Sequence, residues 1–485
     1  MKKRRFTKQF ILLRVLASLL GFIPVVMIPP LALALALGET NMTYGFVFPA
    51  LGTTLLSLAS FLSLKKKKLD LNARDGFFLV FVTWVLASLI GTIPFRAAGL
   101  GFTDAYFESA CTFATTGGTT VGDIESLPRS LLLWRSLAHW FGGIGIVLIS
   151  VALMPLLGVG GFQLIKAEAP GPEKEKITPK VTVTAKLLWL AYSVLTLVLF
   201  GLYCAGGMGW FDALCHSLTT MASGGVSTRN AGLAAFDSPF IDWVSTVFML
   251  LAGLNFRLYY RFLQGKFREL INNTEAHIYL ILFTLAAAII TVSIVPVYGS
   301  FSAAIRYASY HAASVLSTTG SATAGYEQWP GLAQMVLFTL MFVGGCSGST
   351  AGGIKVIRHV VLWKQMSNEM KRVLYPSAVF SIQLNKRVGR KDIIYGVAGF
   401  FFLYLAVVTV TTMVTAASGI DLFSSFSAAL SITGNVGAGF GAIGPGHNYG
   451  AFPGHIKWLY SFVMIAGRLE LWTVFLLFSP VYWKR

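Results

Sequence analysis

Four segments of the chain share one design: FTDAYFESACTFATTGGTTV from Phe102, WFDALCHSLTTMASGGVST from Trp210, SFSAAIRYASYHAASVLSTTGSATAG from Ser300 and DLFSSFSAALSITGNVGAGFG from Asp421. Each has an Asp or Ser near its start that suits a helix beginning, continues as a short apolar helix and ends in small residues and glycine. The spacing from Asp104 to Gly117 equals that from Asp212 to Gly225. Each segment is too short and too polar to cross a membrane twice, so the pattern predicts a half-helix and a loop, repeated four times.

The composition places these segments in a polytopic membrane protein. The 485 residues are 55% hydrophobic and 12% charged, with a mean hydropathy of +0.69, whereas about a quarter of residues are charged in soluble globules. This balance disfavours a soluble enzyme or a secreted disulfide scaffold, and the four cysteines are predicted to be reduced packing residues. Since a crossing needs about 20 apolar residues, we expect ten spans, at 10–37, 43–64, 76–98, 130–157, 183–205, 240–262, 276–297, 332–364, 394–417 and 456–480.

The spans and half-helices together predict an all-α fold. Each half-helix lies between two spans, which gives four pseudo-repeated helix, pore-loop, helix units around one pore, preceded by two extra N-terminal transmembrane helices. The predicted boundaries are 1–70 for the two extra helices and 71–165, 166–270, 271–375 and 376–485 for the four pore units. In the third unit the second helix is expected to be broken.

The distribution of charge predicts how the chain is oriented. The net charge is +18 and the pI about 9.8, and the Lys and Arg residues concentrate at 1–9, 65–75, 158–186, 263–275 and 358–392. Alternate connectors carry more acidic than basic residues. Because cytosolic connectors are rich in Lys and Arg, we expect a multi-pass protein with both termini in the cytosol and the half-helices entering from outside. The basicity is therefore a membrane signal, and no nucleic-acid partner is expected.

Loops of this kind at membrane depth predict an ion path. Non-helical backbone survives there only when it is buried in protein or lines a water-filled path. A half-helix entering from outside directs its partially negative carboxyl end to the membrane centre, which favours a cation. The loop that follows offers carbonyl oxygens in place of the ion's hydration shell, and glycine lets these carbonyls turn inward. Tight helix packing is the alternative for any single loop, but four equivalent loops indicate a pore.

Short motifs along the chain carry a resemblance to a known family. They are TTGGTTV at 115–121, WFGGIGIV at 140–147, AEAPGP at 167–172, SGGVST at 223–228, GLNF at 253–256, FVGGCSGSTAGGIKVIR at 342–358 and AGRLE at 466–470. With them the chain resembles the Trk/Ktr/HKT superfamily of cation transporters, and most closely its bacterial Trk-type potassium-uptake membrane subunit, over essentially its whole length.

The resemblance implies a potassium selectivity filter. By position in this sequence, its residues are Thr116, Gly117, Gly224, Gly225, Thr319, Gly320, Val436 and Gly437, and those implied to bind potassium are Thr116, Gly117, Gly225, Thr319, Gly320 and Gly437. Two loops depart from the family pattern. Ser321 stands where an aromatic residue is frequent, and the fourth loop lacks the usual proline, so Gly439 stays an alternative to Gly437. Family members with serine in the first loop tend toward sodium, so Gly117 implies potassium.

A gate is expected below the filter. The glycine run at 344–353 predicts a break in the eighth span, because glycine costs about 1 kcal/mol relative to alanine inside a helix. The resemblance implies an intramembrane loop that obstructs ion passage and moves to open it. Arg468 lies near the middle of the last span, where a charge is costly and usually faces a cavity, so we expect a positive barrier or a tether of this loop, with a structural ion pair as the alternative. The expected gate residues are Gly344, Gly345, Gly348, Gly352, Gly353, Lys355 and Arg468.

The resemblance also implies partners and a location. Its members form homodimers in the bilayer of the bacterial inner (plasma) membrane and associate with a cytosolic nucleotide-binding regulatory subunit (TrkA-like). We expect potassium as the transported ion, and no nucleotide bound by this chain, because it has no soluble domain of its own. The electrochemical gradient would drive transport, so no catalytic residue is expected and the chain is not predicted to be an enzyme.

Two other functions remain open. A carrier that couples potassium or sodium to protons or sodium by symport also uses broken helices, although fourfold repetition argues against it. The run Gly345-Cys346-Ser347-Gly348 fits the GxSG pattern of intramembrane serine hydrolases. Such an enzyme needs a histidine base beside the serine, and His447 and His455 are expected near an outer loop instead.

Overall fold

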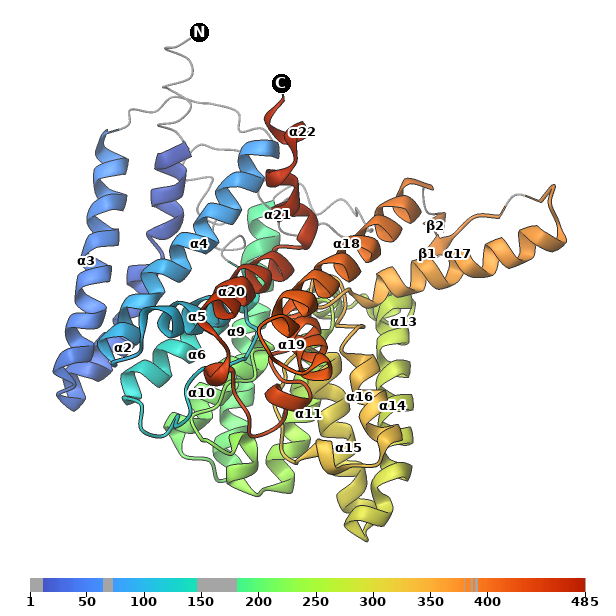
Figure 1. Cartoon of the computed structure of the whole chain (residues 1–485), viewed down its shortest axis with the longest axis horizontal. Helices are drawn as coiled ribbons and strands as arrows, with labels where there is room; N and C mark the ends of the chain where they lie inside the picture. The colour runs from blue at the N-terminus through green and yellow to red at the C-terminus, as the bar shows by residue number, and fades with distance from the viewer. Residues whose placement is uncertain are drawn as a thin grey trace.

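The described part of the chain is built almost entirely of helices (Figure 1). The structure is a computed structural model that describes residues 12–63, 73–145, 181–378, 380–384, 387–388 and 391–484. Its strands are one antiparallel pair of two residues each, β1 (Gln383–Leu384) and β2 (Arg387–Val388). The AEAPGP motif at 167–172 and the end of the predicted span 130–157 lie outside the described residues.

Two helices precede the repeated part of the chain. They are α2 (Ile23–Leu37) and α3 (Thr40–Ser63), and α3 lies at the left edge of Figure 1. Gly38 ends α2 in the left-handed conformation, with a φ of 69° that glycine adopts without steric cost. Because α2 packs on α3 and α6, and α3 on α4, these two helices form an extra layer on one side of the first unit.

Each of the four units consists of a long first helix, a short second helix that we call the pore helix, and a third helix. The first helices are α4 (Ala73–Ala97), α9 (Val181–Ala205), α14 (Thr274–Tyr298) and α18 (Lys391–Ala416). The pore helices are α5 (Phe102–Phe113), α10 (Trp210–Met221), α15 (Phe301–Leu316) and α19 (Leu422–Gly434). Of the acidic residues expected to start them, Asp421 caps α19 by accepting from Ser424 N, whereas Asp104 and Asp212 lie inside the first turns of α5 and α10.

The third helix of units two, three and four is interrupted, and of these interruptions only the one in unit three was predicted. In unit one, α6 (Arg129–Ile144) ends at Gly145. In unit two, α11 (Pro239–Gly253) and α12 (Phe256–Leu263) meet at 95°. In unit three, the expected break separates α16 (Gly331–Leu340) from α17 (Val356–Leu374). In unit four, α20 (Gly454–Arg468) and α21 (Leu471–Phe478) meet at 116°. The spans predicted at 240–262 and 456–480 therefore each contain a sharp bend that the sequence analysis did not predict.

Short elements complete the connections. They are the short α-helices α13 (Phe267–Ile271) and α22 (Pro480–Trp483) and the 3-10 helices η1 (Gly232–Phe236), η2 (Tyr326–Gln328), η3 (Gly441–Ile443) and η4 (Tyr449–Ala451). The Tyr482 hydroxyl donates to the carbonyl of Arg74 at 2.7 Å, so α22 lies beside the start of α4. In Figure 1, α17 extends away from the body of the molecule, to the right.

The hydropathy of the helices fits a bilayer. Among the described residues, six helices are long and apolar enough to span a membrane, or up to eight if each bent pair counts as one span. Their large apolar side chains remain exposed on the outer surface, among them Leu62, Leu197, Val292 and Phe402, each more than 65% exposed. An apolar surface of this extent favours contact with lipid rather than with water.

The four units close into a ring. The third helix of unit one, α6, packs on pore helix α10 of unit two, α11 packs on α15, and α20 of unit four packs back on α5 of unit one. Between units three and four, the ring of Phe338 on α16 lies 5.8 Å from that of Phe426 on α19. The fold is therefore the predicted one: an all-α polytopic membrane protein with four pseudo-repeated units about one axis and two extra N-terminal helices.

Candidate functional site

The loops that follow the four pore helices share one backbone conformation. In each loop a left-handed residue is followed, two positions later, by a left-handed glycine. The pairs and their φ values are Thr115 (51°) and Gly117 (82°), Ser223 (54°) and Gly225 (61°), Thr318 (56°) and Gly320 (71°), and Asn435 (54°) and Gly437 (85°). We call the four glycines the ring glycines. Positive φ values at two alternate positions turn the chain sharply there, and only glycine adopts them freely.

The ring glycines lie against one another's loops in a closed circle. A Cβ on any of them would collide with the carbonyl oxygen just before the next ring glycine. The colliding pairs are Gly117 with Gly224, Gly225 with Thr319, Gly320 with Val436, and Gly437 with Thr116. The order runs from unit one to unit four and back to unit one, so the loops enclose a central axis at which no side chain on these glycines would fit.

The carbonyls of Thr116, Gly224, Thr319 and Val436, here called the ring carbonyls, are left without donors. Among the described residues, none of the four accepts a hydrogen bond. Buried carbonyls are normally hydrogen-bonded, so four carbonyls in one circle with no donor in the described ranges have oxygen lone pairs available for a cation. All four pore helices also direct their partially negative carboxyl ends toward this circle.

The positive φ value and the close approach to a ring carbonyl are both found at Gly437. They are not found at Gly439, the alternative left open by the sequence. Gly439 donates its N–H to the carbonyl of Ile443 at 3.1 Å, and its own carbonyl accepts from the Tyr326 hydroxyl at 2.7 Å. Gly439 is therefore part of the outer loop and packs against η3.

All the predicted gate residues except Arg468 lie in one irregular loop, residues 341–355. The loop closes on itself, because Lys355 N donates to the carbonyl of Val343 and Val356 N to that of Gly345, each at 3.1 Å. A Cβ on Gly344 would lie 2.8 Å from the Cα of Gly353, so both glycines are needed for this close approach. Gly344, Gly348, Gly353 and Lys355 all have positive φ values between 75° and 78°.

This 341–355 loop is attached to the carboxyl ends of the pore helices. The hydroxyls of Ser223 and Thr350 are 2.8 Å apart, and Gly352 N donates to the hydroxyl of Thr318 at 2.7 Å. Ser223 and Thr318 are the left-handed residues that precede two of the ring glycines. The loop therefore lies directly below the circle and is bonded to it in units two and three.

The break between α11 and α12 provides a seat for the same loop. Cys346 N donates to the carbonyl of Gly253 at 2.8 Å, and Phe256 N donates to that of Gly348 at 3.1 Å. Both partners are backbone groups that the interruption of the helix leaves available. The motif GLNF at 253–256 thus acts as the docking site of the loop.

Arg468 reaches the loop from the last unit. Its guanidinium donates to the carbonyls of Thr350 at 2.6 Å, Gly142 at 2.7 Å and Gly143 at 2.6 Å. It therefore joins the 341–355 loop to the end of α6, which is the geometry of a tether. Arg358 and Glu470 form an ion pair in the same region, and the Lys355 ammonium donates to the carbonyl of Ala351.

Two buried carboxylates were missed by sequence reasoning. Glu275 on α14 is 3% exposed and accepts from Ser347 N at 2.7 Å and Ile357 N at 3.3 Å, so it joins the middle of the loop to the start of α17. Glu108 on α5 accepts from Thr120 N at 2.6 Å and pairs with Arg135 at 3.2 Å. For Glu108 the signal is a charge inside a pore helix, which is costly unless it has a specific role, whereas Glu275 lies in the first turn of α14 and its sequence context gives no such signal.

Another carboxylate, that of Asp123, lies on the side of the ring opposite the 341–355 loop. Asn230 donates to Asp123 at 2.8 Å and accepts from Ile124 N at 2.7 Å, which ties the loops of units one and two together. The hydrogen bond from Asn230 lowers the pKa of Asp123 below its ordinary value. Asp123 is thus a stable negative charge at this mouth.

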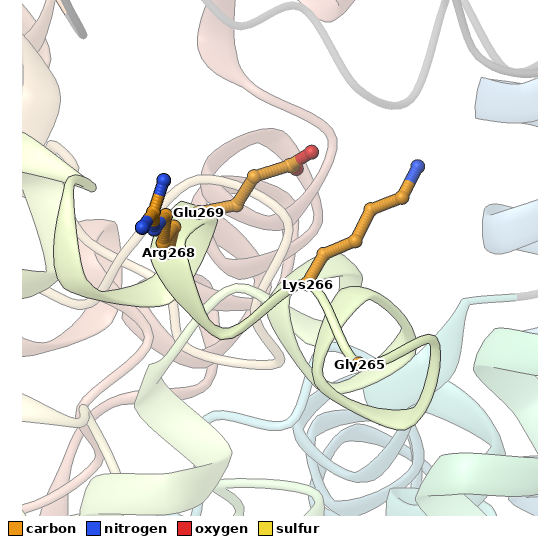
Figure 2. Close-up of a pocket in the computed structure, with 4 residues that line it drawn as sticks. All are labelled: Gly265, Lys266, Arg268 and Glu269. Atoms are coloured by element: carbon orange, nitrogen blue, oxygen red, sulfur yellow. The ribbon is translucent and has the colours of Figure 1, made fainter.

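Other features of the described residues do not add a site. Figure 2 shows a surface hollow between α12 and α13, lined by Gly265, Lys266, Arg268 and Glu269; it contains no residue of the ring or of the loop. No group of His, Cys, Asp and Glu in the described ranges is arranged to hold a metal. His455, one of the two histidines considered for a serine hydrolase, bonds Ser418 at 2.9 Å, and Ser347 N donates to Glu275 at 2.7 Å.

The chain has extensive similarity to proteins of one family. The family model of TrkH, described as a cation transport protein, matches residues 41–485. The chain is 38% identical over 427 residues to the Trk system potassium uptake protein TrkH of Escherichia coli K12, covering 87% of this chain and 88% of that protein. It is 36% identical over 482 residues to TrkH of Halomonas elongata, covering 98% and 99%.

The tertiary structure agrees with these similarities. The crystal structure of the potassium transporter TrkH from Vibrio parahaemolyticus matches with a TM-score of 0.86 and 31% identity, covering 98% of this chain and 99% of that one. The family match, the sequence identities and the fold extend over nearly the whole chain. The chain therefore belongs to the TrkH family of cation transport proteins.

Proposed function

We propose that this chain is the ion-conducting membrane subunit of a potassium-uptake system. The observation that carries the proposal is the circle of four ring carbonyls, which lie between left-handed residues and have no donor among the described residues. Such carbonyls replace the hydration shell of a cation. The relatives in Escherichia coli and Halomonas elongata are named as potassium uptake proteins, and this favours potassium as the transported ion.

The filter consists of the ring glycines and the residues that bear the ring carbonyls. Potassium passes between them. Carboxylates such as Asp123 attract cations to the outer mouth. The ion loses water to the ring carbonyls, where the carboxyl ends of four pore helices favour its charge. The electrochemical gradient drives the passage, so no catalytic residue takes part and the protein is not an enzyme.

The 341–355 loop is the gate. It lies below the ring, is bonded to Ser223, Thr318 and Arg468, and closes on itself through glycines. The closed position is also held by the hydrogen bonds to Gly253, Phe256 and Glu275. Opening would break the bonds to Ser223, Thr318 and Arg468 together.

Location and assembly follow from the same reading. The basic segments that alternate along the sequence favour both termini in the cytosol of a bacterial inner membrane. We propose a homodimer that is regulated by a cytosolic nucleotide-binding subunit (TrkA-like), since the described helices include no soluble domain of their own. The basic connectors between the units are the surfaces available to that subunit.

Rubidium flux into proteoliposomes tests the proposal. The full chain is expected to take up rubidium in preference to sodium, without dependence on an imposed pH gradient. Gly117→Ser should lower the rubidium-to-sodium ratio, because any Cβ at this position collides with the carbonyl of Gly224. Gly201→Ser is the matched control, since nothing lies within 4 Å of a Cβ there.

Two outcomes would contradict the proposal. An unchanged ratio in Gly117→Ser would show that the ring does not select the ion. Rubidium uptake that requires a proton or sodium gradient would favour a coupled carrier instead.

A further inference from the structure

One residue on each pore helix clamps the ring from behind. It lies six positions before the ring glycine, and its side chain donates to the carbonyl just after that glycine. The four bonds are Cys111 Sγ to Gly118 at 2.9 Å, Thr219 Oγ1 to Val226 at 3.0 Å, Ser314 Oγ to Ser321 at 2.6 Å and Ser431 Oγ to Ala438 at 2.9 Å. We call these four donor residues the clamp residues.

The clamp residues also hold the other side of each ring glycine. The backbone carbonyl of each one accepts the N–H of the residue that bears a ring carbonyl. These bonds are Thr116 N to Cys111 at 3.0 Å, Gly224 N to Thr219 at 2.8 Å, Thr319 N to Ser314 at 2.8 Å and Val436 N to Ser431 at 2.9 Å. A single residue therefore brackets each ring glycine with two hydrogen bonds.

In each pore loop, the carbonyl before the ring glycine and the carbonyl of the residue after it differ in their hydrogen bonding. The carbonyl after each ring glycine is occupied by a clamp side chain, whereas no donor in the described ranges occupies the ring carbonyl before it. All four clamp residues are at most 1% exposed, so water does not compete for these bonds. One carbonyl of each loop is thus held against its pore helix while the other stays available.

We propose that Cys111, Thr219, Ser314 and Ser431 are positioning residues that determine ion discrimination in the proposed filter. A filter discriminates by the number and placement of its carbonyls. Each clamp residue holds the residues on both sides of a ring glycine, through the N–H of the one before it and the carbonyl of the one after it, and so sets both properties. This inference rests on the proposed function, and it goes further by assigning discrimination to residues that never touch the ion.

The four clamps differ in strength. A thiol is a weaker donor than a hydroxyl, so unit one, with Cys111, is the least firmly held. Cys111→Ser should therefore keep or raise discrimination, whereas removal of a hydroxyl in another unit should lower it. The clamp residue carries a hydroxyl in three units and a thiol in one. Because of this difference in residue type, composition alone assigned Cys111 to packing.

The test compares Thr219→Val with Thr219→Ser in proteoliposomes. Valine keeps the shape of threonine but cannot donate, and we expect the rubidium-to-sodium uptake ratio to fall by about threefold to tenfold, as one lost hydrogen bond predicts. Rubidium uptake itself should persist, and Thr219→Ser should restore the ratio. Thr291→Val is the matched control, because that buried hydroxyl bonds only within α14, to Ala287 at 2.6 Å.

The outcomes separate this inference from the proposed function. A wild-type chain that does not prefer rubidium over sodium would overturn both. A selective wild type with an unchanged ratio in Thr219→Val would overturn the inference alone. If Thr219→Val fails to fold, Cys111→Ser decides: a ratio equal to or above the wild-type value supports the clamp, and a lower ratio contradicts it.

Discussion

Arg468 on α20 donates a 2.6 Å hydrogen bond to the backbone carbonyl of Thr350 in the 341–355 loop. The same guanidinium is bonded to Gly142 and Gly143 at the end of α6. One side chain therefore connects units one, three and four below the ring. This connection makes the closed position of the loop depend on a residue more than a hundred positions away in the sequence.

Arg468→Ala is expected to raise rubidium uptake. Hydrogen bonds from a charged group contribute about 1.5–3 kcal/mol each, and even one of them is equivalent to roughly a tenfold shift toward the displaced loop. Tracer uptake into proteoliposomes of matched protein content measures the effect, and Arg468→Lys should give an intermediate value. Wild-type uptake in a folded Arg468→Ala variant would mean that the tether does not hold the gate.

Thr318→Val should also favour the displaced loop, but less strongly. The substitution removes the acceptor of Gly352 N and keeps the side-chain shape, so uptake should rise by about twofold to tenfold for one hydrogen bond. Thr318→Ser retains a hydroxyl and should behave as wild type. Thr412→Val serves as the control, because its hydroxyl bonds within α18, to Val408 at 2.8 Å. Equal uptake by Thr318→Val and the control would contradict this role.

Glu108→Gln is expected to destabilise the protein. Arg135 and Glu108 are 2% and 1% exposed, and Nε and Nη1 of Arg135 have no hydrogen-bond partner among the described residues. Breaking a buried ion pair by removing one partner costs about 3–5 kcal/mol, because the other charge is left uncompensated. The thermal unfolding midpoint in detergent measures the loss. The double variant Glu108→Gln/Arg135→Met should recover much of it, and a double variant no more stable than the single one would contradict this explanation.

Features that depend on local pattern were predictable from the sequence. The repeat of span, half-helix and loop follows from the spacing of apolar, small and glycine residues, and the predicted fold is confirmed. The glycine run at 344–353 predicted the interruption between α16 and α17 because so many glycines are incompatible with a stable helix. The family resemblance also implied Gly117, Gly225 and Gly320, which the structure brings into one circle, and left Gly437 and Gly439 as alternatives for the fourth position.

Features that depend on pairing between distant segments were decided by the tertiary structure. The sequences 240–262 and 456–480 are apolar enough for hydropathy to predict spans, but each is bent sharply, and at the bend between α11 and α12 backbone groups bond to the 341–355 loop of another unit. The partner of Glu108 is Arg135 on the next helix, and Glu275 contacts the loop of its own unit across more than seventy residues. The sequence shows that a carboxylate is present, but it does not identify the group that pairs with that carboxylate.

The sequence by itself therefore determined the membrane fold, its fourfold repetition and the residue types at the ring, because hydropathy and helix termination act over a few neighbouring residues. Only the tertiary structure decided which carbonyls are left without donors, that Gly437 rather than Gly439 completes the circle, and that Arg468 and the clamp residues hold what surrounds it. These properties depend on hydrogen bonds between groups that lie far apart in the sequence. Donor and acceptor come within bonding distance only when the four units close.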